Sequence, residues 1–147
     1  MNYIVKNREK KRYHIAFRRF LKGENCHYQI REYVSLNFLE MRQYIESKMI
    51  EGMNWENYGS YWVIDHIVPI RLFDVFDPEE LRICWNYQNL MPLKKDHNLH
   101  KEGDLRFSKM VLENVEHTHV VKKLLEKVNK GLSEMDIYVK NNSIWLK

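Results

Sequence analysis

The chain has 147 residues, 44% of them hydrophobic, so its length and composition favour one globular domain with an adequate core. The net charge of +4 and the pI of about 9.0 favour an anionic partner. No long apolar run opens the chain, so we expect neither a signal peptide nor a membrane span. We therefore expect an intracellular, cytoplasmic protein. Cys26 and Cys84 form no CxxC pair, so we expect no structural zinc.

Basic side chains are concentrated near the N-terminus, in a segment that we place at residues 1–34. Residues 6–22 hold eight Lys or Arg side chains and one acid, so the remainder of the chain is net acidic. Helical spacing predicts a helix that ends near Gly23 and has an apolar face made of Tyr13, Ala16, Phe17, Phe20 and Leu21. The opposite face carries the side chains that we predict to contact nucleic acid: Arg8, Lys11, Arg12, Arg18, Arg19 and Lys22. Phosphate contacts would relieve their mutual repulsion. A solvated polar face and a membrane-surface helix are the alternatives.

Three local patterns organise the middle of the chain. Asn37 and Glu40 have the spacing of a capping box, which predicts a helix from residue 38. The glycine-bounded segment 52–59 predicts an ordered loop, in which Trp55 and Tyr58 either pack under the next strand or stack on a base. Asp77-Pro78 predicts the start of a short helix that ends near residue 85.

Between the loop at 52–59 and the short helix that starts at Asp77-Pro78, a run of strand-forming residues contains an adjacent Asp65-His66 pair. Neighbouring side chains on a strand point to opposite faces, so the two residues take different tasks. Asp65 is a hard oxygen donor suited to Mg²⁺ or Mn²⁺, and His66 can take a proton from an attacking water. Asn98, in the first turn of the following helix, would be the second oxygen ligand, and water and phosphate would complete the coordination.

These residues, in this order, resemble the HNH nucleases. Asp65-His66 matches the first motif, Asn89 matches the second, and Asn98 matches the third, with Lys101 as a basic residue three positions later. The resemblance covers a core that we place at residues 35–106. It implies an α+β fold with a small ββα-metal (His-Me finger) core and additional helices. In that family the residue matching Asn89 steadies the loop through backbone hydrogen bonds and is not a ligand.

The implied activity is hydrolysis of DNA phosphodiester bonds with one Mg²⁺ or Mn²⁺ ion, by nicking or double-strand cleavage. We take His66, Asp65, Asn89 and Asn98 as the catalytic set, with Asp65 and Asn98 on the metal. The flanking segments look like those of HNH proteins of bacteriophages, so the source would be a phage or mobile element acting in a host cell. Its role would be homing, phage packaging or degradation, or defence.

Two positions depart from the family pattern. Asn98 stands where histidine gives the family its name, so neighbouring His97 is an alternative ligand. Arg71 stands where phage relatives often have serine, and we take it as a candidate phosphate contact. Two other functions stay open on the same fold. One is a degenerate module that binds nucleic acid without cutting it, and the other is a junction resolvase or RNase.

Residues 107–147 form an extension that the resemblance does not explain. Its pattern predicts a helix from Thr118 to Lys130 that ends at Gly131. The segment 137–146 then predicts a hairpin around Asn141-Asn142. This extension would provide extra packing surface, target recognition or self-association.

Overall fold

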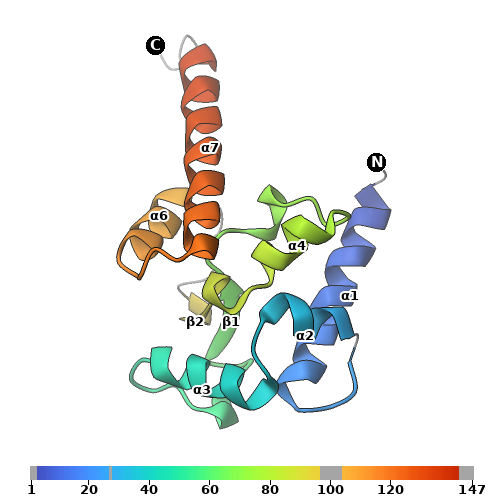
Figure 1. Ribbon diagram of the computed structural model, residues 1–147. Helices are drawn as coiled ribbons and strands as arrows, with labels where there is room; N and C mark the ends of the chain where they lie inside the picture. The colour runs from blue at the N-terminus through green and yellow to red at the C-terminus, as the bar shows by residue number, and fades with distance from the viewer. Residues whose placement is uncertain (1–2, 27, 97–103, 143–147) are drawn as a thin grey trace.

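The structure of the chain is a computed structural model that describes residues 3–26, 28–96 and 104–142. It is mostly helical with one two-stranded antiparallel sheet, which agrees with the predicted α+β class. The described elements, in chain order, are α1 (Tyr3–Leu21), α2 (Tyr28–Val34), α3 (Phe38–Lys48), η1 (Trp55–Asn57), β1 (Trp62–His66), η2 (Ile70–Leu72), α4 (Pro78–Cys84), η3 (Tyr87–Asn89), β2 (Leu90–Lys94), α6 (Leu105–Glu113) and α7 (His119–Asn142). Figure 1 shows their arrangement.

The sheet joins two segments that are far apart in the sequence. β1 pairs with β2 in a register that places Trp62 opposite Lys94 and His66 opposite Leu90. Two strands alone are marginally stable in water, so this pair depends on its packing. Trp62 and Leu90 are almost fully buried and anchor the two strands to the core.

Helix α1 has the two faces that the sequence predicts. Its buried residues are Tyr13, Ala16, Phe17, Phe20 and Leu21. The helix ends two residues before Gly23, whose φ of 73° lies in the left-handed region that glycine tolerates best. The Gly23 and Glu24 amides donate to the carbonyls of Phe20 and Arg19, which is a Schellman arrangement. The position of the apolar face and the helix stop are therefore confirmed.

The capping box before α3 is also confirmed. The Glu40 amide donates to Asn37 Oδ1 at 2.8 Å, and the Asn37 amide donates to Glu40 Oε1 at 3.1 Å. In the following loop, the rings of Trp55 and Tyr58 lie 5.3 and 4.9 Å from that of Trp62. These side chains therefore pack against the strand, as one of the two interpretations predicted.

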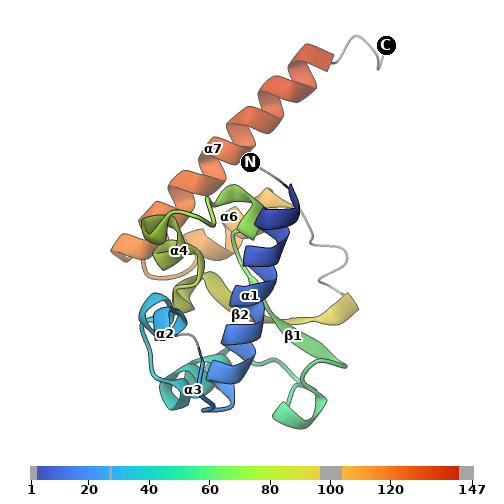
Figure 2. The ribbon, with the colours of Figure 1, turned by 90° about the vertical axis from the view of Figure 1, so that its right-hand side faces the viewer.

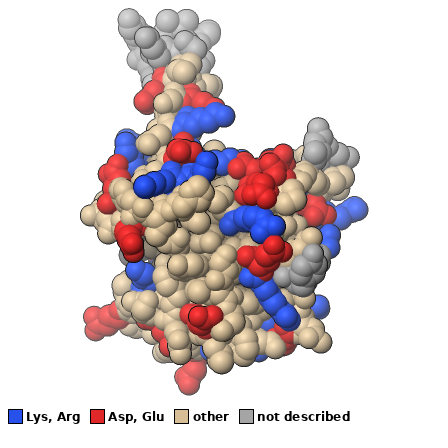
Figure 3. Space-filling model, in the orientation of Figure 1, with Lys and Arg blue, Asp and Glu red and all other residues tan. Residues whose placement is uncertain are grey.

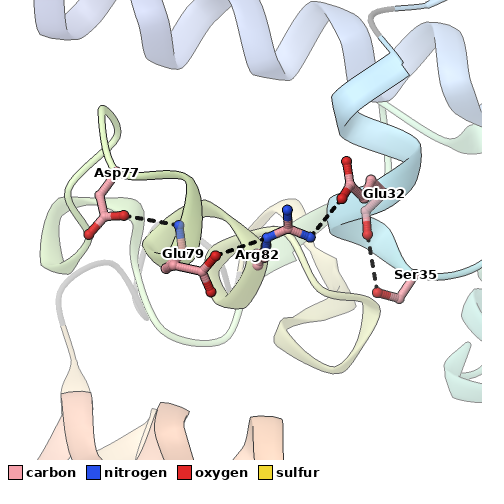
Figure 4. A network of polar contacts seen from close by, with 5 residues as sticks. All are labelled: Glu32, Ser35, Asp77, Glu79 and Arg82. Atoms are coloured by element: carbon pink, nitrogen blue, oxygen red, sulfur yellow. Dashed lines mark hydrogen bonds and ion pairs between the residues drawn. The ribbon is translucent and has the colours of Figure 1, made fainter.

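Helix α4 begins at the predicted place and is tied to α2 by one arginine. The Glu79 amide donates to Asp77 Oδ1 at 3.0 Å, as expected of an N-cap. Arg82 then bridges Glu79, at 3.4 Å, and Glu32 of α2, at 2.8 Å (Figure 4). All three charged groups are partly exposed, so the network orients α4 more than it stabilises it.

One buried cluster includes residues from α1 to α7. Trp62 and Trp85 are its largest fully buried side chains, and Trp85 follows directly after α4. Within the described ranges, no helix combines the length and the apolar character needed to cross a bilayer.

The predicted ending of the chain is wrong. Residues 137–142 continue α7 and form no hairpin, and Gly131 lies inside the helix. A helix that is already packed extends without a new nucleation step, whereas an isolated hairpin gains little. Gly131 lets α7 approach its neighbours closely, because a Cβ there would lie 2.6 Å from Leu105 Cδ1. The last turns of α7 project beyond the remainder of the fold in both views (Figures 1 and 2).

Candidate active site

Asp65 and His66 end strand β1, and the structure gives them different environments. Asp65 is half-buried, lies opposite Met91, and accepts the His66 amide on Oδ1 at 2.9 Å. His66 is 5% exposed, and its Nε2 atom is shielded from solvent. The His66 ring meets Trp85 edge to face, with centroids 4.4 Å apart. The carboxylate and the imidazole are therefore held at one strand end in distinct surroundings.

Asn89 joins the two residues after this strand end to the end of α4. Its side chain is fully buried, with Oδ1 accepting the Val68 amide at 2.8 Å. Nδ2 donates to the carbonyls of Cys84 at 2.9 Å and Val68 at 3.2 Å. The Ile67 amide also donates to the Asn89 carbonyl at 2.7 Å. One amide thus joins the residues after His66 to the end of α4 and the start of β2, through the backbone hydrogen bonds that the resemblance implies.

Ser108 of α6 adds a second brace that sequence reasoning missed. Its hydroxyl donates to the Ile67 carbonyl at 2.6 Å, and the residue is 1% exposed. This contact spans 41 residues, and an isolated serine carries no local signal of such a partner. The C-terminal extension therefore helps to fix the backbone directly after His66.

Helix α1 covers the His66 side of the sheet, which sequence reasoning also missed. The ring of His14 lies 6.0 Å from that of His66 and 5.2 Å from that of Trp85, both edge to face. A small cavity of about 110 Å³ opens here, lined by His14, Phe17, Arg18, Tyr58, Val63, Ile64, His66, Trp85 and Leu90. The only sequence signal was the place of His14 at the border between the apolar and basic faces of the helix.

The surroundings of His14 favour its neutral form. Desolvation of the ring lowers its pKa from the ordinary 6.5, and the cations of Arg18 and Lys10 lower it further. The Asp65 carboxylate acts in the opposite direction and raises this pKa. The net shift is downward, so His14 is uncharged at pH 7 while part of the residue stays exposed to solvent.

The predicted metal ligands fall partly outside the described residues. Asp65 is described, whereas Asn98, its alternative His97 and the basic Lys101 lie in the range 97–103 that is not. Within the described part of the chain, no group of three or more His, Cys, Asp or Glu side chains could hold a metal ion. Mg²⁺ keeps several waters and takes one or two carboxylates together with phosphate oxygens. A site with Asp65 as its carboxylate suits that preference.

The six predicted phosphate contacts of the basic segment lie on the exposed face of α1 and, for Lys22, directly after the helix. All six side chains are exposed, and Arg12 also forms an ion pair with Glu9 at 3.9 Å. Figure 3 shows basic side chains at the edge where α1 lies, whereas acidic and basic groups alternate over α4. Arg71, in η2, is exposed as well. Arg18 differs from the other five because it also lines the His66 cavity.

The comparisons with known proteins give relatives without a described activity. No family model and no solved structure matches the chain. The chain is similar to two uncharacterized proteins of Acanthamoeba polyphaga mimivirus. One is 36% identical over 67% of this chain and 41% of the relative, and the other is 23% identical over 77% and 48%. The chain therefore matches less than half of the length of either relative.

Proposed function

We propose that this chain is a divalent-metal-dependent endonuclease that hydrolyses phosphodiester bonds in DNA. The observation that carries the proposal is the pairing of Asp65 and His66 at a strand end that Asn89 clasps from within the core. The proposed core is the ββα-metal arrangement, with β1 and β2 as its two strands. The sequence resemblance to HNH nucleases supports this assignment.

His66 acts as the general base in the proposed reaction. Its imidazole takes a proton from a water molecule, the water oxygen forms a bond to phosphorus, and the bond from phosphorus to the 3′ oxygen breaks. The leaving oxygen takes a proton from solvent, so the products are a 5′ phosphate and a 3′ hydroxyl. The hydrogen bonds of Asn89 and Ser108 hold the backbone after His66, which keeps the imidazole in place for this step.

Asp65 and Asn98 are the proposed ligands of the cation. When bound, Mg²⁺ or Mn²⁺ supplies positive charge to the phosphate and to the leaving oxygen. Asp65 contributes a half-buried carboxylate beside the base. Its Oδ1 accepts the amide of the next residue, and this contact limits the rotation of the carboxylate. The protein thus offers the cation one oriented charged ligand on the described part of the site.

The exposed face of α1 holds the DNA backbone in this proposal. The side chains of Arg8, Lys11, Arg12 and Arg19, and that of Lys22 directly after the helix, are exposed to solvent. Such contacts neutralise phosphates and release counterions, and they carry no sequence information. The source of sequence or structure preference would then lie elsewhere in the protein.

The test is cleavage of supercoiled, linear and branched DNA and of RNA in parallel, with Mg²⁺, with Mn²⁺ and with a chelator. The proposal expects nicks or breaks in DNA that require the cation. DNA that is bound and never cut under any of these conditions would instead make the chain a nucleic-acid-binding module. Cutting of only the branched substrate or only RNA would identify a junction resolvase or an RNase.

A further inference from the structure

We propose that Arg18 and His14 of α1 form a phosphodiester-binding site over His66, and that Arg18 contacts the scissile phosphate there. This inference rests on the proposed function for the identity of the bound phosphate as the scissile one. It separates Arg18 from the remaining basic residues of α1, which hold the DNA backbone at a distance from the reaction.

The first observation is the shared cavity. Arg18 and His14 line the same space of about 110 Å³ as His66. The two α1 residues are four positions apart, so their side chains are neighbours on the helix surface. The remaining predicted phosphate contacts on α1, Arg8, Lys11, Arg12, Arg19 and Lys22, do not line this cavity. The helix therefore brings one cation and one further imidazole to the cavity that the proposed base, His66, also lines.

The second observation is the charge around this cavity. The Arg18 cation acts to lower the pKa of His14 and that of Tyr58, and both residues line the cavity together with Arg18. Across residues 3–26, 28–96 and 104–142, no carboxylate forms an ion pair with Arg18. A guanidinium presents a planar fork of donors that matches two phosphate oxygens. Neutral His14 adds one N–H donor beside that fork.

The third observation is the access to the cavity. His66 is 5% exposed, and the small cavity that it lines is also lined by His14 and Arg18 of α1, so the proposed approach of a phosphate to His66 is from the α1 side. Arg18 and His14 are both exposed residues on that side, whereas Phe17 and Trp85 beneath them are buried. A phosphate that approaches His66 from this side meets Arg18 and His14 first. Arg18 would then stabilise the negative charge that grows on the phosphate during attack.

The kinetic test compares Arg18→Ala with Arg31→Ala, which changes an exposed arginine of α2 that has no proposed part in binding or catalysis. Loss of a donor to the reacting group typically costs about 10² to 10³ in kcat. At saturating DNA and with Mn²⁺ present, we expect Arg18→Ala to lower kcat about 10²-fold and Arg31→Ala to leave kcat unchanged. Arg18→Lys should recover part of the loss, because it restores the charge without the fork. Equal kcat values for the two alanine variants would overturn the assignment of Arg18.

A second measurement does not depend on cleavage. Inorganic phosphate is titrated at constant pH, without metal, while the His14 ring is followed by NMR. We expect a saturable shift of the His14 ring signals in wild type and in Arg31→Ala, and none in Arg18→Ala. An identical response in Arg18→Ala would overturn the phosphate site. A response that depends on Arg18, in a wild-type protein that cleaves no nucleic acid, would support the site and refute the proposed nuclease.

Discussion

Replacing Asn89 with alanine should destabilise the fold substantially. The fully buried side chain makes three hydrogen bonds to backbone groups of Val68 and Cys84. Each such bond contributes about 0.5–1.5 kcal/mol, and the groups left unsatisfied in the core oppose relaxation, so we expect a loss of about 3 kcal/mol. For a chain of this length, that corresponds to a fall in Tm of about 6–12 °C.

Thermal and urea unfolding, followed by circular dichroism, measure this effect directly. Asn86→Ala is the matched control, because within the described part of the chain the Asn86 side chain accepts one hydrogen bond, from the Gln88 amide at 2.9 Å, and caps η3. Loss of a cap typically costs about 1 kcal/mol, so the control should lie well above Asn89→Ala in Tm. An Asn89→Ala protein that melts like wild type yet has no activity would show that Asn89 acts in the chemistry and that the clasp described above is not its main role.

Three further predictions test separate parts of the site. Asp65→Asn should weaken binding of Mn²⁺ in calorimetric titration, because it removes the charged ligand, and unchanged affinity would move the metal site elsewhere. In metal-free protein, NMR titration should give His14 a pKa below 6.5, which falls further in Asp65→Asn and rises in Arg18→Ala; shifts of the opposite sign would contradict the placement of these charges. Neutralising the outer basic face of α1 should lower DNA affinity and flatten its salt dependence. Each lost contact should reduce the slope of log K against log salt concentration by roughly 0.9. An unchanged slope would show that this face is merely solvated. The variant for that last test combines substitutions at Lys11, Arg12, Arg19 and Lys22.

The sequence predicted elements whose signals are local. The faces of α1 follow from helical spacing, its end follows from Gly23, and α3 follows from a capping pair three residues apart. The backbone hydrogen bonds of Asn89 were expected from the family resemblance, since periodicity gives no sign of them. Local signals of this kind need no knowledge of how distant segments pack.

The features that escaped prediction depend on contacts between distant segments. The cover of His66 by His14 requires α1 to lie over β1, and the bond from Ser108 to Ile67 joins residues 41 positions apart. The seven residues of α2 are too few to show a clear period. The nine residues of α6 are amphipathic, so that helix could have been predicted from its spacing. Gly131 has the pattern of a helix stop, but the close approach of Leu105 gives it a different role.

The most direct test of the account is the role of His66 as the base. Single-turnover cleavage of plasmid DNA with Mn²⁺ should be compared for wild type, His66→Ala and a control, His117→Ala, which changes an exposed histidine between α6 and α7. Loss of a general base typically costs about 10² to 10⁴ in rate. We therefore predict a fall of that size in His66→Ala, with DNA affinity retained, and no change in the control. A folded His66→Ala protein that cleaves DNA at nearly the wild-type rate would contradict the account.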